Sequence, residues 1–180
     1  MKGLVLSLTL GGTALAALAV SPAFSQGATS ALQGHDSNAP VNVASDRIEV
    51  QDRADRAIFS GNVVAQQGNL TLNAARITLA YTNAGGIEIE RIDASGGVTL
   101  RSPSETARSQ FAIYDLNSRL ITMIGNVTLT RGESRVNGGR LVLDLDSGRA
   151  VMDGGGAAPV GTRSEGGRVT GVFTVPQRTN

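Results

Sequence analysis

The chain has 180 residues, of which 41% are hydrophobic, 3% are aromatic and 17% are charged, and it contains no cysteine. This length fits a single domain with terminal extensions, and the lack of cysteine excludes disulfide bonds and thiolate catalysis. The 16 basic residues balance 15 acidic ones and are scattered along the chain, which argues against nucleic acid as a partner.

Residues 1–25 have the pattern of a signal peptide that is cleaved after export. Lys2 provides a basic start, an apolar run continues to Val20, and small residues precede position 26. The run is nearly long enough to be a membrane anchor, but Pro22 interrupts it and favours cleavage. We therefore expect an exported protein whose mature chain begins at Gln26.

Residues 26–40 are rich in Ser, Ala, Gly and Asn and show no apolar periodicity. Such a composition is typical of a disordered leader. The segment contains His35, the single histidine of the sequence. We interpret His35 as a solvated residue without a role as a metal ligand or a catalytic base.

From Val41 onward, short runs of alternating apolar and polar residues are separated by Gly, Asn and Ser, which predicts β-strands and turns. The stretch 60–81 recurs at 124–145, with Gly61-Asn62 matching Gly125-Asn126, and a weaker copy lies between them. This repeated β-unit predicts an all-β fold of stacked strands, arranged as a sandwich, a jelly roll or a solenoid.

Two local patterns lead to more detailed expectations. Asn137-Gly138 is the strongest hairpin signal of the chain. In the stretch 109–116, Phe111 and Ile113 share one parity whereas Tyr114 and Leu116 share the other, so the inward face is ambiguous and a β-bulge would reconcile the two.

Catalytic motifs are missing from the sequence, in which Lys2 is the only lysine. Glu88 and Glu90 share one face of a predicted strand, and we interpret them as a solvated row rather than the carboxylate pair of a glycosidase. Asp144 and Asp146 are a weak calcium signal. We therefore expect no enzyme, no metal and no cofactor. The apolar strand faces form either an ordinary core or an interior that binds alkyl chains.

A family resemblance accompanies these patterns. The order of ASDRIEV, FSGNVVAQQGNLTLNAARITLAY, SQFAIYDL, IGNVTLTRGESRVNGGRLVLDL and RVTGVFTVP resembles the periplasmic lipopolysaccharide-transport protein A (LptA, OstA-like) family over residues 41–176. The resemblance implies a twisted, open β-jelly roll of stacked antiparallel strands with solenoid-like repeats and a hydrophobic groove. It leaves 177–180 as a tail and implies transport of lipopolysaccharide through its lipid A part, without catalysis.

The resemblance also implies which residues contact the lipid and which join the partner proteins. Lipid-lining positions would be the dry-face residues Val41, Val43, Ile48, Val50, Val63, Leu72, Ile77, Leu79, Val98, Leu100, Phe111, Tyr114, Val127, Leu129, Leu141 and Leu143. Partner-joining edge strands would be Val41, Asn42 and Val43 at one end and Val169, Thr170, Gly171, Val172, Phe173, Thr174 and Val175 at the other. Because lysine is absent after the signal, Arg76 and Arg140 would make weak contacts with lipid phosphates.

Partners follow from the same resemblance. They are lipopolysaccharide, an LptC-like inner-membrane protein, an LptD-like outer-membrane protein and further copies of the chain joined head to tail in the periplasm. Two alternatives stay open at this point. One is an LptC-like adaptor of the same pathway, and the other is a β-solenoid protein that binds carbohydrate.

Overall fold

The computed structural model describes residues 35–83, 85–154 and 167–174. The predicted signal peptide, the first part of the predicted leader, Val175 and the 177–180 tail lie outside the described residues. No helix within the described ranges is long and apolar enough to cross a membrane.

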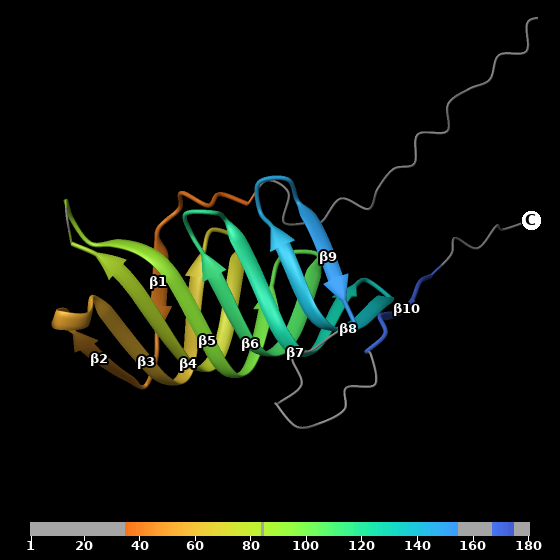
Figure 1. Cartoon of the computed structure of the whole chain (residues 1–180), viewed down its shortest axis with the longest axis horizontal. Coiled ribbons are helices and arrows are strands. Elements are labelled where there is room, and N and C mark those ends of the chain that lie inside the picture. Colours follow the sequence, from red (N-terminus) through yellow and green to blue (C-terminus); the bar gives the residue numbers. More distant parts are fainter. Residues whose placement is uncertain (1–34, 84, 155–166, 175–180) are drawn as a thin grey trace, which may run out of the picture.

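A single antiparallel sheet of ten strands makes up the structure (Figure 1). The strands are β1 (Val41–Ala44), β2 (Arg47–Gln51), β3 (Arg56–Gln67), β4 (Leu70–Thr82), β5 (Glu88–Arg101), β6 (Glu105–Asp115), β7 (Leu120–Arg131), β8 (Ser134–Asp144), β9 (Arg149–Asp153) and β10 (Thr170–Val172). A short 3-10 helix (Asp52–Ala54) joins β2 to β3. The sheet order is β1-β3-β4-β5-β6-β7-β8-β10, while β2 also pairs with β3 and β9 with β8. The predicted all-β, open jelly-roll architecture is confirmed.

Glycine-containing pairs inside strands bend the sheet along one line, which we call the crease. Gly61 and Asn62 in β3 have φ of 78° and 44°, and their repeat mates Gly125 and Asn126 in β7 have 88° and 50°. The register with the neighbouring strands shifts at both pairs. These positive φ values tolerate few side chains and are typical of bulges. The sequence repeat therefore marks bulges within strands rather than turns between them.

The hairpin predicted at Asn137-Gly138 is wrong. Both residues lie inside β8, where they pair with Thr128 and Val127. A tight two-residue turn needs positive φ at its centre, and the glycine between β7 and β8 that has it is Gly132, at 54°.

The crease divides the sheet into two layers that face each other. Layer one contains β2, β9 and the adjoining segments of β3 to β8, and layer two contains β1, β10 and the remaining segments. Leu72 of layer two and Ile77 of layer one belong to the same buried cluster. The Tyr114 hydroxyl of layer one donates a hydrogen bond of 2.9 Å to Oε1 of Gln67 in layer two. Contacts between strands that are not sheet neighbours thus close the fold.

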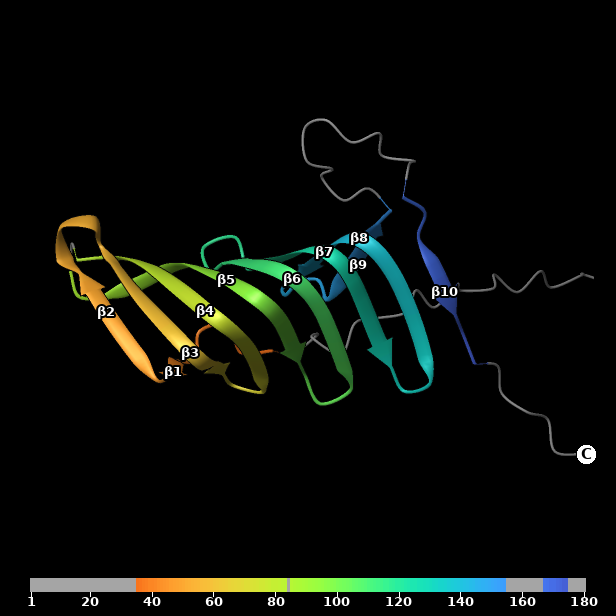
Figure 2. The same ribbon diagram turned by 90° about the horizontal axis from the view of Figure 1, so that it is seen from below.

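Turns form two rims along the side of the sheet opposite the crease. Rim one, in layer one, comprises residues 52–55, 83, 85–87, 116–119 and 145–148, and rim two, in layer two, comprises residues 68–69, 102–104 and 132–133. Figure 2 shows the strands following one another along the long axis from β2 to β10. The molecule is therefore a folded sheet with an interior between its layers, two rims and two ends.

Candidate functional site

The apolar interior between the layers contains most residues that the sequence placed there. Ile77, Met123 and Leu141 have no exposed surface, and burying side chains of this size contributes roughly 1.5–3 kcal/mol each. Ten of the predicted groove residues are buried: Val63, Leu72, Ile77, Leu79, Val98, Leu100, Tyr114, Val127, Leu141 and Leu143. Val41, Val43 and Leu129 are partly buried and pack against that cluster.

Ile48 and Val50 share the inward face but are not covered. They pair with Phe59 and Ala57, which face the interior, yet they are 55% and 56% exposed. The reason is their place in β2, the last strand of layer one, beyond which no described strand packs. The prediction that Ile48 and Val50 are buried is therefore wrong, although both side chains lie on the interior side of the sheet.

Phe111 faces away from the interior, so the prediction that it lines the groove is wrong. Its side chain is 52% exposed. In β6 the inward parity changes at the crease, from Ala107 and Ser109 before it to Ala112 and Tyr114 after it. The register shift between Arg108 and Phe111 precedes the mixed-parity residues, and pairing is continuous from Phe111 to Asp115. Phe111 and Ile113 therefore face outward while Tyr114 faces inward, and the prediction that a bulge would reconcile the two parities is wrong.

Arg76 and Arg140 also lie on the outer face. Arg76 pairs with Ser95, which pairs with Phe111, and Arg140 pairs with Ile124, so all share the outward row of Phe111. Arg140 is 3.7 Å from the Asp153 carboxylate. Neither guanidinium points into the interior, which contradicts the predicted contacts with the phosphates of a lipid held there.

Several lining residues escaped the sequence prediction. Ile92, Ile121 and Met123 are buried, as are small residues such as Ala94 and Ala112. Ile92 was hidden because β4 and β5 shift register between Ala80 and Tyr81, so strict alternation along 87–93 misplaces it. The alternation along each strand could have identified the two alanines as inward-facing residues. Their small side chains let the two layers approach closely.

The layers are in contact, and little free space is left between them. The gap lined by Leu72, Leu100 and Ile121 has a volume of only about 20 Å³, room for about one water molecule. A larger hollow of about 310 Å³ lies near the end formed by β8 to β10, lined by Leu129, Val136, Ala150, Phe173 and others. In the gap beside Ile121, an apolar ligand longer than a methyl group would have to part the layers.

Residues 35–40, which we call the strap, lie between the two rims just before β1. In Figure 1 the strap is the orange segment that runs along the top from β1. His35 is only 8% exposed, with its ring nitrogens 3.0 Å from Asn69 Oδ1 and 3.2 Å from Gln67 Oε1. The prediction of a solvated His35 in a leader without structure is therefore wrong for this segment. Sequence reasoning missed it because its contacts are polar and distant in the chain.

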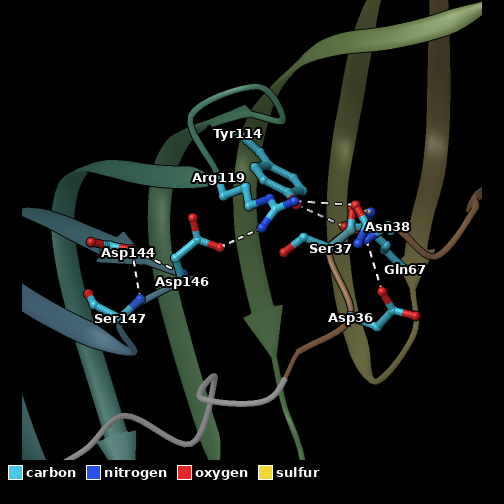
Figure 3. Close-up of polar contacts among 9 residues, drawn as sticks. All are labelled: Asp36, Ser37, Asn38, Gln67, Tyr114, Arg119, Asp144, Asp146 and Ser147. Atoms are coloured by element: carbon cyan, nitrogen blue, oxygen red, sulfur yellow. Dashed lines mark hydrogen bonds and ion pairs between the residues drawn. The ribbon is translucent and has the colours of Figure 1, made fainter.

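Gln67 joins the strap to both layers (Figure 3). Its Nε2 donates to the carbonyl oxygens of Ser37 at 2.9 Å and Ala39 at 3.0 Å, and its Oε1 accepts from the Tyr114 hydroxyl. Gln67 is 5% exposed and occupies an inward position of β3, in line with Val63 and Ala65. The sequence could have indicated a role for Gln67, because it is a polar residue in an inward row that is otherwise apolar.

The other anchor of the strap is Arg119 on rim one. Figure 3 shows its guanidinium between Asp146 and Asn38, at 2.8 Å from the Asp146 carboxylate and 3.3 Å from the Asn38 side-chain oxygen. Burial raises the pKa of the neighbouring Tyr114 phenol, while contacts with Ser37, Arg119 and Gln67 act in the opposite direction. Tyr114 therefore stays a neutral hydrogen-bond donor at physiological pH.

The remaining polar groups of the described residues take part in ion pairs and turns. Glu105 is 7% exposed and pairs with Arg131 at rim two. The Asp144 carboxylate accepts the backbone N–H groups of Asp146 and Ser147, which is a turn contact rather than a calcium loop. Within the described ranges no three His, Cys, Asp or Glu side chains come together to hold a metal.

The folded antiparallel sheet with an apolar interior and polar rims places the chain in the class of β-jelly-roll proteins. Residues 42–149 match the family model described as LptA/(LptD N-terminal domain) LPS transport protein. The chain belongs to this family of lipopolysaccharide-transport proteins.

Individual relatives agree with the family match. An uncharacterised protein of Rhizobium meliloti (strain 1021) is 33% identical over 147 residues, covering 77% of this chain and 79% of that protein. The lipopolysaccharide export system protein LptA of Haemophilus influenzae is 24% identical over 133 residues, covering 71% and 77%. The LPS-assembly protein LptD of Yersinia enterocolitica is 31% identical over 88 residues, but these cover only 11% of LptD.

A solved structure shows the same fold. It is LptH of Pseudomonas aeruginosa, described as the LptA-homologous periplasmic component of the lipopolysaccharide transport device. The superposition has a TM-score of 0.66 at 19% identity and covers 78% of this chain and 99% of LptH.

Proposed function

We propose that this protein carries lipopolysaccharide from the inner to the outer membrane, with the acyl chains of lipid A held between the two layers. The observation that carries the proposal is an apolar interior that runs along the sheet and reaches the surface at both ends. Ile48 and Val50 are exposed at the β2 end, and the hollow beside Phe173 lies at the other. Each buried methylene of an acyl chain contributes on the order of 0.8 kcal/mol.

The ends of the sheet support a bridging role. β1 and β10 stand at the two ends of the strand order, so each has an unpaired backbone edge within the described part of the chain. Such edges accept a further strand by β-augmentation. We infer that LptC-like and LptD-like partners, or further copies of this chain, join head to tail at these edges and continue the apolar interior from one subunit to the next.

We also propose that the protein is located in the periplasm. The signal-like residues 1–25 support export, and LptH, which shares the fold, is described as periplasmic. Among the described residues, the buried positions form no row of aromatic or carboxylate side chains, and Glu88 and Glu90 are exposed at the start of β5. These features favour a lipid carrier over a carbohydrate-binding or catalytic protein.

Site-specific photo-crosslinking tests the proposal in living cells. A benzoylphenylalanine at Tyr114, which is buried, is expected to crosslink to lipopolysaccharide. The matched control is the same residue at Phe111, an aromatic position on the same strand that faces outward. Equal crosslinking at both positions, or crosslinking at Phe111 alone, would rule out transport through the interior.

A further inference from the structure

The strap covers the place where the interior opens between the rims, beside Gln67 and Tyr114. Residues 35–40 contact rim two through Asn69 and rim one through Arg119. Beneath them lie Val41, Leu70 and Ile121, which line the narrow gap of the interior together with Gln67 and Tyr114. The strap is thus the cover of a site with apolar walls and two polar groups at its mouth.

Weak attachment distinguishes the strap from the strands. It has no ladder pairing, because β1 begins only at Val41. Its described hydrogen bonds to the sheet involve the side chains of Gln67, Asn69 and Arg119, and Ser37 also contacts Tyr114. It can therefore leave without breaking the sheet, which a strand cannot do.

Gln67 determines what can replace the strap. If the strap leaves, both amide hydrogens of Gln67 lose their acceptors in an apolar surrounding, which is unfavourable unless new acceptors arrive. Carbonyl, carboxylate or phosphate oxygens at the head of an acyl chain meet this need. A bare alkane does not, so the mouth favours amphiphiles over hydrocarbons.

We propose that the mouth beneath residues 35–40 is the portal through which an acyl chain enters the interior, and that Gln67 and Tyr114 bind the oxygen-rich head of the amphiphile once the strap has left. This inference rests on the proposed function because it takes the interior to be the acyl-chain site. It adds the portal, the residues at its mouth and the requirement that the strap move.

A reversible lock on the strap provides the test. The chain contains no cysteine, so Asn38→Cys with Ser118→Cys allows a cleavable bis-maleimide to tie the strap to rim one, where both native residues are exposed. Association of a dansyl-labelled fatty acid is followed by stopped-flow fluorescence. We expect locking to slow association roughly tenfold or more, and cleavage of the linker to restore the original rate.

A second variant tests Gln67 without tying the strap. Gln67→Leu keeps the volume of the side chain but removes its bonds to Ser37, Ala39 and Tyr114, so association should become faster and the preference for the fatty acid over a dansyl alkane should fall. The matched control is Gln110→Leu, the same change at an exposed position of β6 that does not line the gap, which should alter neither.

The outcomes separate this inference from the proposed function. If the locked protein binds the fatty acid as fast as the unlocked one, the chain enters elsewhere, and the portal is refuted while lipid carriage stands. If the unaltered protein binds neither the fatty acid nor lipopolysaccharide, the proposed function fails and the portal fails with it.

Discussion

At the scale of single residues, Gly96 shows why the crease depends on glycine. Its φ is 85°, and a Cβ added there would lie 2.6 Å from the Cβ of Ala75. Both the backbone conformation and the close approach exclude a larger residue. Glycine is therefore required at this bulge for two reasons, the backbone conformation and the close contact with Ala75.

Gly96→Ala should lower the free energy of unfolding by about 2–4 kcal/mol, combining the cost of positive φ with that of overpacking. Urea denaturation monitored by circular dichroism measures the loss. Gly85→Ala is the control, because nothing lies within 4 Å of a Cβ added at Gly85, and its effect should stay within roughly 0.5 kcal/mol. If both variants lose the same amount of unfolding free energy, crowding at Gly96 is not the cause of the loss.

Two aspartates make the fold sensitive to acid. The pKa of Asp115 is lowered chiefly by the backbone N–H of Ser118, and that of Asp144 by the backbone N–H of Ser147. Because the folded pKa lies below the ordinary value of 3.8, these contacts stabilise the fold above that pH, and the stabilisation is lost as the pH falls below it.

We therefore expect the urea midpoint to fall between about pH 4.5 and about pH 2.5, and to fall less steeply in the double variant Asp115→Asn, Asp144→Asn. The measurement is a series of urea titrations across this range. An unchanged slope in the double variant would show that other carboxylates cause the acid sensitivity.

At the scale of strands, the ends of the sheet matter most. The edge at the N-terminal end is split between β1 and β2, and the opposite edge between β9 and β10, so each layer ends on its own short strand. A partner that continues both layers must therefore supply a strand on either side of the crease. The exposed Ile48 and Val50 of β2 are the apolar part of this surface.

Ile48→Glu should weaken head-to-tail association several-fold while changing stability by less than roughly 0.5 kcal/mol, since the side chain is already exposed. Sedimentation velocity over a range of concentrations measures the association. Ile87→Glu is the control, because Ile87 is 75% exposed but lies on rim one, away from the ends. Equal weakening by both substitutions would indicate non-specific hydrophobic contacts.

At the scale of the whole molecule, the proposed binding of an acyl chain between the two layers requires the layers to separate. The gap between them holds only about 20 Å³, and protein interiors are too closely packed to accept a ligand without movement. We expect this movement at the crease, where the register of the ladders shifts and regular pairing is interrupted. The rims, which few contacts join, are where the opening should be largest.

Spin labels at Asn117→Cys on rim one and Glu133→Cys on rim two should move apart on binding of lipopolysaccharide. The expected increase is roughly 4 Å, the spacing at which apolar groups make contact, measured by double electron–electron resonance. Labels at Asn117→Cys and Ser147→Cys, both on rim one, should keep their distance. A constant distance across the rims in the lipid-bound protein would exclude binding between the layers.

Strand content, the repeat and most inward residues followed from the sequence alone, because alternation and turn residues are local properties. Val63 and Leu72 could be placed by parity within one strand, and glycine at a repeated position already marked a special backbone conformation. The family resemblance added the open jelly roll that the strand pattern left undecided among several all-β folds.

Tertiary structure alone decided which residues face inward after the crease and what closes the rims. A bulge reverses parity within a continuous strand, so the alternation before the crease does not show that Phe111 and Ile113 face outward and Tyr114 faces inward after it. The strap depends on hydrogen bonds that join Gln67 to residues about thirty positions earlier and Arg119 to Asn38. Such polar contacts between distant positions leave no periodic trace in a sequence, because they arise only when the folded sheet brings its two rims together.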